Sequence, residues 1–231
     1  MAEYDAIVDR AAQRKGGLPA LESMLPARPN PDVLASRPDS WLLGEMTRSI
    51  FQSGFVWRVI DQKWDSFCEA FVGFEPVALM RLDDQAWENY RHDSRIVRNP
   101  QKIRALRHNL WFVQELSAQY GGFGRFLAEW PVNDLIGLFE LLKKQGSRLG
   151  GNTGQYFLQR VGVDSFALTR DVVCALQLAG LEIRDNPTSR RDLQAIQAFF
   201  NDWLARGPWS YLQMSHILAY SVGDNRVMPN G

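Results

Sequence analysis

Two short stretches hold the residues whose types and spacing could bind a ligand, and the first is the segment 51–57. Gln52 offers an amide to a planar ligand, and Phe55 and Trp57 offer flat aromatic faces. Gly54 can adopt backbone angles closed to other residues, so it predicts a corner between the apolar helical patterns on either side. The same residues would also suit a packed helix–helix junction, and the pattern alone favours that interpretation.

The second stretch is rich in glycine and follows Lys143 and Lys144 at the end of an apolar helical pattern. Glycines let a backbone approach other groups closely, and the first amides of a helix point at anions, so a DNA phosphate would fit there. A structural turn fits the stretch equally well. The candidate residues are Arg148, which adds positive charge, and Gly150, Gly151, Asn152, Thr153 and Gly154.

One acidic residue, Asp171, stands at the start of a predicted helix at 170–179. The helix dipole stabilises an acid in a first turn, which requires no function and is the favoured explanation on pattern alone. In a cleft, the same carboxylate could hold a water molecule or stabilise positive charge on a sugar.

A run of basic residues at 91–107 could form a second strip that faces phosphate groups. Acidic residues are sparse within it, although such runs are most often solvated faces. The run comprises Arg91, Arg95, Arg98, Lys102, Arg104 and Arg107.

The composition excludes several classes of protein. Apolar residues make up 45% of the 231 residues, which predicts a folded core. The 26 basic residues balance 26 acidic ones, so any nucleic-acid site must be a local patch. Cys68 and Cys174 lie in apolar helical patterns and predict reduced core thiols of a cytoplasmic protein. The histidines and cysteines lack metal-ligand spacing, and no apolar run reaches the length of a membrane span.

The elements that must position these residues are all helices. Apolar residues at helical spacing, with capping residues and with glycines or prolines at the ends, predict an all-α fold of many short helices and no strand. The predicted helices lie near residues 40–53, 57–71, 76–80, 83–87, 101–120, 134–145, 155–162, 170–179, 188–203 and 211–222, and prolines predict an irregular connection at 26–38.

Several segments, taken in order, resemble the DNA-3-methyladenine glycosylase I family. The match begins with Leu43–Met46 and continues with the segment 51–57, where the family has a Gln-Ala-Gly-Leu-Ser-Trp type of sequence. It continues through Phe74–Val77, Arg95–Ile103 and the Leu-Lys-Lys-Gln-Gly sequence at 142–146. No single segment is specific, but their order and spacing together are, over roughly residues 40–175.

The resemblance implies a helix-hairpin-helix DNA glycosylase, which is all-α and bilobed. The chain 1–231 would be one glycosylase-like domain, with an irregular segment at 1–39, a core at 40–185 and C-terminal helices at 186–231 that pack on the core. It would act as a monomer, without a membrane or an obligate protein partner. It would hydrolyse the N-glycosidic bond of alkylated bases of the 3-methyladenine class in double-stranded DNA, as a monofunctional enzyme of base-excision repair.

The family also suggests roles for the candidate residues. Trp57 and Phe55 would stack on the damaged base, and Gln52 would contact its edge. Apart from the family, we hypothesise that the Asp171 carboxylate stabilises the positive sugar and positions water, and that Lys102 joins the glycine-rich stretch and Arg148 in contacting DNA. The zinc ligands of the family have no counterpart in this chain, so we expect no metal and no cofactor.

One departure from the family leaves other functions open. The position of the glutamate that reads the base falls near Ser49, beside Arg48, so the expected acid is absent. A second hypothesis is therefore a non-catalytic DNA-damage-binding protein of the same fold. A third hypothesis, favoured by the zero net charge, is a helical protein-interaction module.

Overall fold

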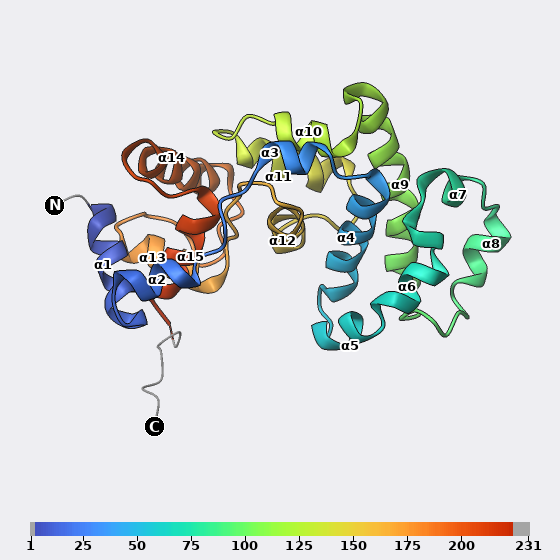
Figure 1. The fold of residues 1–231 in the computed structure, drawn as a ribbon, viewed down its shortest axis with the longest axis horizontal. Coiled ribbons are helices and arrows are strands. Elements are labelled where there is room, and N and C mark those ends of the chain that lie inside the picture. The colour runs from blue at the N-terminus through green and yellow to red at the C-terminus, as the bar shows by residue number, and fades with distance from the viewer. Residues whose placement is uncertain (1–2, 224–231) are drawn as a thin grey trace. The chain divides into compact units, whose positions relative to one another are not determined.

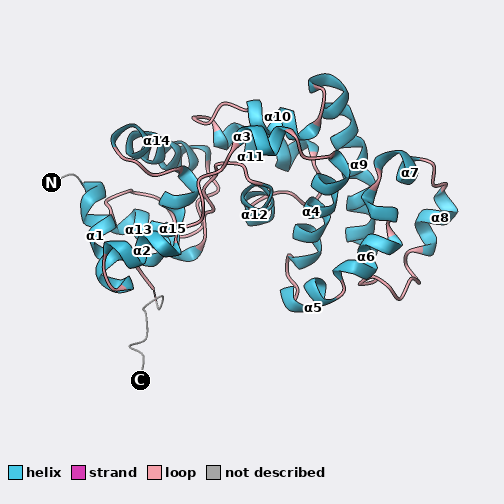
Figure 2. Ribbon diagram, in the orientation of Figure 1, coloured by secondary structure: helices cyan, strands magenta, loops and turns pink. Residues whose placement is uncertain are grey.

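The computed structural model describes residues 3–223, and all regular structure in that range is helical (Figure 2). The predicted all-α fold is therefore confirmed. The described residues divide into two compact units, each built from separate stretches of the chain. Within the described range, the first unit takes in residues 3–29, 131–136 and 164–223, and the second takes in residues 30–130 and 137–163.

Figure 1 labels the helices of both units and colours them along the chain, from blue near the N-terminus to red near the C-terminus. The first unit contains α1 (Glu3–Lys15), α2 (Leu18–Met24), α13 (Arg170–Leu178), α14 (Arg190–Arg206) and α15 (Tyr211–Ser221). The second unit contains α3 (Pro31–Ala35), α4 (Asp39–Gln52), α5 (Trp57–Gln62), α6 (Trp64–Ala70), the 3-10 helix η1 (Val72–Phe74), α7 (Pro76–Met80), α8 (Asp84–Asn89), α9 (Pro100–Tyr120), α10 (Phe123–Glu129) and α12 (Asn152–Val161). Helix α11 (Leu135–Gln145) begins in the first unit and continues in the second.

The centre of the second unit is α4, which packs against α9, α10, α12 and η1. Leu42, Leu43, Met46 and Ile50 recur on one face of α4 and are fully buried, because that face meets its neighbours at helical spacing. Phe51 at the end of α4 packs edge-on against Phe67 of α6, with ring centroids 4.9 Å apart. This packing fixes the end of α4, where the candidate site begins.

Helix α9 agrees closely with its prediction. Asn99 accepts hydrogen bonds from the first amides of the helix, and Pro100 occupies the first turn, where a missing amide hydrogen is harmless. Gly121 ends the helix in the left-handed conformation, with φ 75°. The sequence signals at both ends are therefore the ones that the structure uses.

The N-terminal segment contains three helices, whereas only a short helix followed by a loop at 1–17 was expected and the rest of 1–39 was expected to be irregular. Pro19 and Pro31 lie in the first turns of α2 and α3, where proline starts a helix instead of breaking it. Asn30 also caps α3 by accepting from the amide of Asp32. The density of prolines was thus a poor guide to irregular structure here.

In the first unit, α1 packs on α15, and α15 also contacts α13 and α14. Tyr4 stacks on Trp203 of α14, with ring centroids 5.3 Å apart and planes 11° from parallel. Cys174 in α13 is exposed, so the prediction of a core thiol is wrong for that residue, whereas Cys68 in α6 is half-buried. Within the described range, no helix has both the length and the apolar character that a membrane crossing requires.

Candidate functional site

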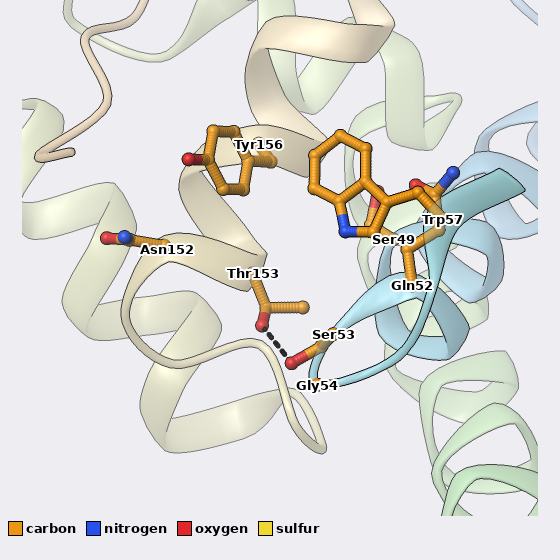
Figure 3. A pocket seen from close by; sticks show the side chains of 8 residues that line it. All are labelled: Ser49, Gln52, Ser53, Gly54, Trp57, Asn152, Thr153 and Tyr156. Atoms are coloured by element: carbon orange, nitrogen blue, oxygen red, sulfur yellow. Dashed lines mark hydrogen bonds between the residues drawn. The ribbon is translucent and has the colours of Figure 1, made fainter. Parts of the chain in front are cut away.

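A cavity of about 210 Å³ lies in the second unit, between the end of α4, the corner at residues 53–57 and the start of α12 (Figure 3). The indole of Trp57 meets the ring of Tyr156 edge-on, with centroids 5.6 Å apart and planes at 84°. Thr153 donates a hydrogen bond of 3.1 Å to the Ser53 hydroxyl and so ties the corner to α12. The cavity is lined by Ser49, Gln52, Ser53, Gly54, Trp57, Asn152, Thr153 and Tyr156.

The lining offers aromatic faces and uncharged hydrogen-bonding groups. Burial raises the pKa of the Tyr156 phenol, which therefore stays neutral at physiological pH. The other lining residues are hydroxyl, amide, indole and glycine groups, so no side chain of the lining is ionised near neutral pH. Such a surface suits a planar ligand that hydrogen-bonds along its edge.

Gln52 belongs to a polar network behind the cavity. Its amide nitrogen donates to Asp61 Oδ1 over 2.8 Å, and its carbonyl oxygen accepts from Arg160 Nη2 over 2.6 Å. The same Asp61 oxygen accepts from Arg48 over 2.6 Å. Glu45 completes the network, 3.5 Å from Arg160 and 3.7 Å from Arg48. We call these five residues the Gln52 network; its two acids balance its two arginines.

The Gln52 network is partly desolvated. Gln52 is only 2% exposed. Burial lowers the pKa of the Arg160 guanidinium, and the charge of Glu45 opposes that shift. One guanidinium nitrogen of Arg160, Nη1, is buried without a hydrogen bond, although it lies in ion-pair range of Glu45. A guanidinium held in this way is fixed in place by its partners.

Lys102 lies inside the corner. It is 6% exposed, and its ammonium donates to the carbonyl oxygens of Phe51 and Ser53 over 3.0 and 2.7 Å. Burial lowers the pKa of this lysine, and repulsion from Arg148 adds to the effect. A cation at the C-terminus of α4 is favourable, because the last carbonyls of a helix lack partners. The structure thus places Lys102 where it supports the corner, away from the surface position expected of a phosphate contact.

Three residues of the basic run are paired with acids from nearby turns. Arg91 contacts Glu88 at 2.7 Å, and Arg95 contacts Asp93 at 2.6 Å. Arg107 pairs with Asp84 of α8, also at 2.6 Å. The local scarcity of acids in the sequence was therefore misleading, since the turns around 83–93 supply them.

The hairpin at 146–151 joins α11 to α12. Asn109 of α9 anchors it by donating to the Ser147 carbonyl over 3.0 Å and accepting from the Ser147 amide over 2.7 Å. Arg148 is exposed with a positive φ of 60° and donates to the Gln101 side chain. Gly150 is exposed beside Lys143.

Helix α12 begins at Asn152, earlier than the predicted residue 155. Gly151 precedes it at φ 59°, a conformation that glycine adopts without strain. No side chain caps this end of α12. The phosphate contact expected of the glycine-rich stretch stays a prediction. Asn152 and Thr153 also line the cavity, which brings this helix end next to the corner.

Two predicted site residues lie elsewhere. Phe55 is 43% exposed and is absent from the cavity lining, although it belongs to the corner. Asp171 lies in the first turn of α13, in the first unit, behind the capping residue Thr169. The catalytic role of Asp171 stays a prediction.

Sequence reasoning missed Tyr156, Asp61 and Arg160. A signal for two of them was present, because Asn152, Tyr156 and Arg160 recur every four residues and so share one face of α12. Ser49 and Gln52 share a face of α4 in the same way. In residues 3–223, no group of three or more histidine, cysteine or acidic side chains is arranged to hold a metal ion.

Solved structures similar to this chain include two glycosylases. One is 3-methyladenine DNA glycosylase I from Staphylococcus aureus, described for its recognition of 3-methyladenine; it has 22% identity and a TM-score of 0.49, and the match covers 55% of this chain and 77% of that one. Another 3-methyladenine DNA glycosylase I has 19% identity and a TM-score of 0.47, over 63% of this chain and 87% of that one. Residues 36–137 match the family model described as methyladenine glycosylase, a range that contains α4, the corner and α9.

Proposed function

We propose that this chain, whose residues 36–137 match the methyladenine glycosylase family model, is a monofunctional DNA glycosylase. Its substrate would be an alkylated base of the 3-methyladenine class in double-stranded DNA, and its reaction the hydrolysis of the N-glycosidic bond. The observation that carries the proposal is the cavity, which is lined by the aromatic rings of Trp57 and Tyr156 and by the uncharged polar side chains of Ser49 and Gln52.

The chemistry of such a base suits this cavity. Alkylation of a ring nitrogen makes the base cationic in the nucleotide, so the glycosidic bond is weak and the leaving group departs neutral. The enzyme therefore needs little acid catalysis and must mainly extrude the nucleotide and hold the flipped base. Aromatic faces contribute stacking to any base and a cation–π attraction of about 0.5–2 kcal/mol to the charged one.

A monofunctional reaction fits the positions of the amines. A lyase step needs an amine that attacks the sugar, and the cavity lining contains no lysine. Lys102 is near the corner, but two backbone carbonyls hold its ammonium. Water is therefore the proposed nucleophile, and base release would leave the DNA strand intact.

Two further groups complete the proposed machinery. A DNA phosphate would bind to backbone amides at the uncapped start of α12, and Arg148 would add positive charge. The residues of this proposed phosphate site are Gly150, Gly151, Asn152, Thr153 and Gly154. For the carboxylate that stabilises the positive sugar and positions water, we propose Asp171. Asp171→Asn would then abolish base release and leave DNA binding intact.

The direct test incubates the purified protein with methylated duplex DNA and measures free bases by chromatography. We expect release of 3-methyladenine and abasic sites without strand cleavage. Intact DNA binding with no released base would contradict the enzymatic proposal.

That negative result would select the second candidate function, a non-catalytic DNA-damage-binding protein. The observation in its favour is Ser49, because a hydroxyl stands in the cavity lining and no carboxylate does. This candidate predicts salt-dependent binding to damaged duplex and no broken bonds.

A further inference from the structure

We infer that Arg160 and Asp61 are positioning residues that fix the polarity of the Gln52 amide, and that Gln52 in turn reads the bound base as one donor next to one acceptor. The inference rests on the proposed function, since it takes the cavity to be a base pocket. It assigns recognition to a residue that carries no charge.

A glutamine amide can usually rotate by half a turn and exchange its donor and acceptor ends. In Gln52 this rotation would cost the two hydrogen bonds to Arg160 and Asp61. Arg160 has only N–H groups and needs an acceptor, so the oxygen of Gln52 faces it at 2.6 Å. An ionised Asp61 can only accept, so the nitrogen of Gln52 faces it at 2.8 Å. Rotation would break both hydrogen bonds and set like groups against each other.

Each end of the amide keeps one unused site after these bonds. A primary amide has two N–H groups and two lone pairs, and the Gln52 network uses one of each. Gln52 also lines the cavity, while it is otherwise buried. In the inferred pocket, the remaining donor and acceptor of Gln52 would be offered to the ligand side by side, which is the pattern that pairs with the amino group and adjacent ring nitrogen of an adenine-type base.

The charge of the network favours the same conclusion. Glu45 and Asp61 balance Arg48 and Arg160, and no lining side chain is ionised near neutral pH. An ion pair with the ligand is therefore not offered by the lining. Selection would then come from uncharged hydrogen-bonding groups, among which Gln52 is the one with a fixed polarity, and from stacking on Trp57, so neutral adenine-type bases should bind.

The experiment compares free adenine with unsubstituted purine, which stacks similarly but lacks the amino group. Calorimetric or NMR titration of the wild type should give an affinity for adenine about tenfold or more above that for purine. In Arg160→Met, where Asp61 alone still orients the amide, the adenine-to-purine affinity ratio should fall by at least about twofold, while purine binding changes little. In Arg160→Lys, which keeps a donor for the Gln52 oxygen, the ratio should be largely restored.

A second variant decides the matter where Arg160→Met does not fold. Asp61 has a side chain that is 41% exposed, so Asp61→Asn is a mild, isosteric change. Because asparagine can donate as well as accept, it no longer forbids the rotated amide, and the ratio should fall by at least about twofold. A wild-type ratio near one, or a ratio unchanged in the folded variants, would overturn the inference.

The two proposals fail separately in these tests. If 3-methyladenine is released from DNA but the adenine-to-purine affinity ratio does not change in the Arg160 and Asp61 variants, the inference is wrong and the glycosylase proposal is still supported. If the adenine-to-purine affinity ratio depends on Arg160 but no base is released from DNA, the role of Gln52 in recognition is supported and the enzymatic proposal is wrong.

Discussion

At the scale of single residues, Trp57 gives the cavity its largest aromatic surface. Its side chain is 46% exposed, so it contributes little to the core and can be removed with little loss of stability. Stacking of one base on an aromatic ring contributes about 1–3 kcal/mol, so Trp57→Ala should lower base release by about fivefold to 150-fold. Single-turnover assays on methylated DNA would measure this loss.

Trp111 supplies the matched control for that variant. It lies in α9, in the same unit, and is 56% exposed, but it lines a different cavity with His108 and Glu115. Trp111→Ala should therefore leave base release unchanged. Equal losses in the two variants would show that an exposed tryptophan matters for some reason other than the base pocket.

Lys102 makes the stability of the corner depend on pH. Its pKa in the folded protein is lowered from 10.5, first by burial and then by Arg148, so the native state releases this proton at a lower pH than the unfolded chain. Between those two pKa values the unfolded chain binds more protons, and the stability contributed by this site rises with pH. Below that window the charged ammonium carries its full burial penalty.

Lys102→Met would reveal this effect. At neutral pH the variant should be less stable by about 1–3 kcal/mol, because the carbonyls of Phe51 and Ser53 lose their donor. As the pH approaches 10.5, the free energy of unfolding of the wild type should increase relative to that of the variant. Urea denaturation followed by circular dichroism would measure the difference, and a difference that is constant or shrinks with pH would refute the assignment.

At the scale of elements, the hairpin between α11 and α12 depends on a close backbone approach. A methyl group at Gly154 would lie 2.2 Å from the carbonyl oxygen of Leu149, which belongs to the backbone and cannot move away cheaply. Gly154→Ala should therefore destabilise the protein by about 1–3 kcal/mol and weaken DNA binding.

Gly150 lies in the same hairpin and offers the comparison. A methyl group there would lie 3.3 Å from Cγ of Lys143, a flexible side chain that can shift. Gly150→Ala should therefore change thermal stability little. If both alanine variants behave alike in thermal melts, the close approach at Gly154 is not what shapes the hairpin.

Local signals in the sequence predicted most of the elements. The cap at Asn99, the proline after it and the glycine at 121 act within one turn of the chain, so the ends of α9 could be read directly. The start of α12 could not, because the helix begins at Asn152 directly after Gly151, which stands in its N-cap position without a capping side chain. Prolines at 19 and 31 were ambiguous for a similar reason, since proline both ends and begins helices.

The site was predictable only in part. The aromatic and amide residues of the corner, Gln52 and Trp57, were identified from type and spacing. The partners of Gln52 were not, because Asp61 and Arg160 reach it from α5 and α12, and only packing against α4 brings those helices together. Lys102 was misplaced for the same reason, since a lysine in a basic run gives no sign that its ammonium faces two backbone carbonyls.

At the scale of the whole molecule, each compact unit gathers stretches that are far apart in sequence. The first unit joins α1 near the N-terminus to α15, where Arg14 donates to the Tyr220 carbonyl over 3.0 Å. No local sequence pattern predicts that α1 packs on α15, because this packing depends on apolar faces that meet only in the folded chain. The family resemblance implied two lobes but did not indicate which stretches of the chain build each compact unit.

The overall charge balance limits how DNA can be bound. With 26 basic and 26 acidic residues, long-range attraction is weak, and Arg91, Arg95 and Arg107 already have acidic partners. We therefore expect a shallow salt dependence, in which each phosphate contact adds about 0.9 to the slope of log K against log salt concentration.

Arg148 and Arg107 make the salt dependence a test of where the DNA lies. Arg148 is exposed on the hairpin and donates to the neutral side chain of Gln101, so Arg148→Gln should weaken binding to all duplexes and lower the slope by about one. Arg107 is engaged with Asp84, so Arg107→Gln should leave the slope unchanged. Fluorescence anisotropy at several salt concentrations would measure the slope for both variants. If Arg107→Gln lowers the slope and Arg148→Gln does not, the DNA contacts the basic run on α9 and not the hairpin.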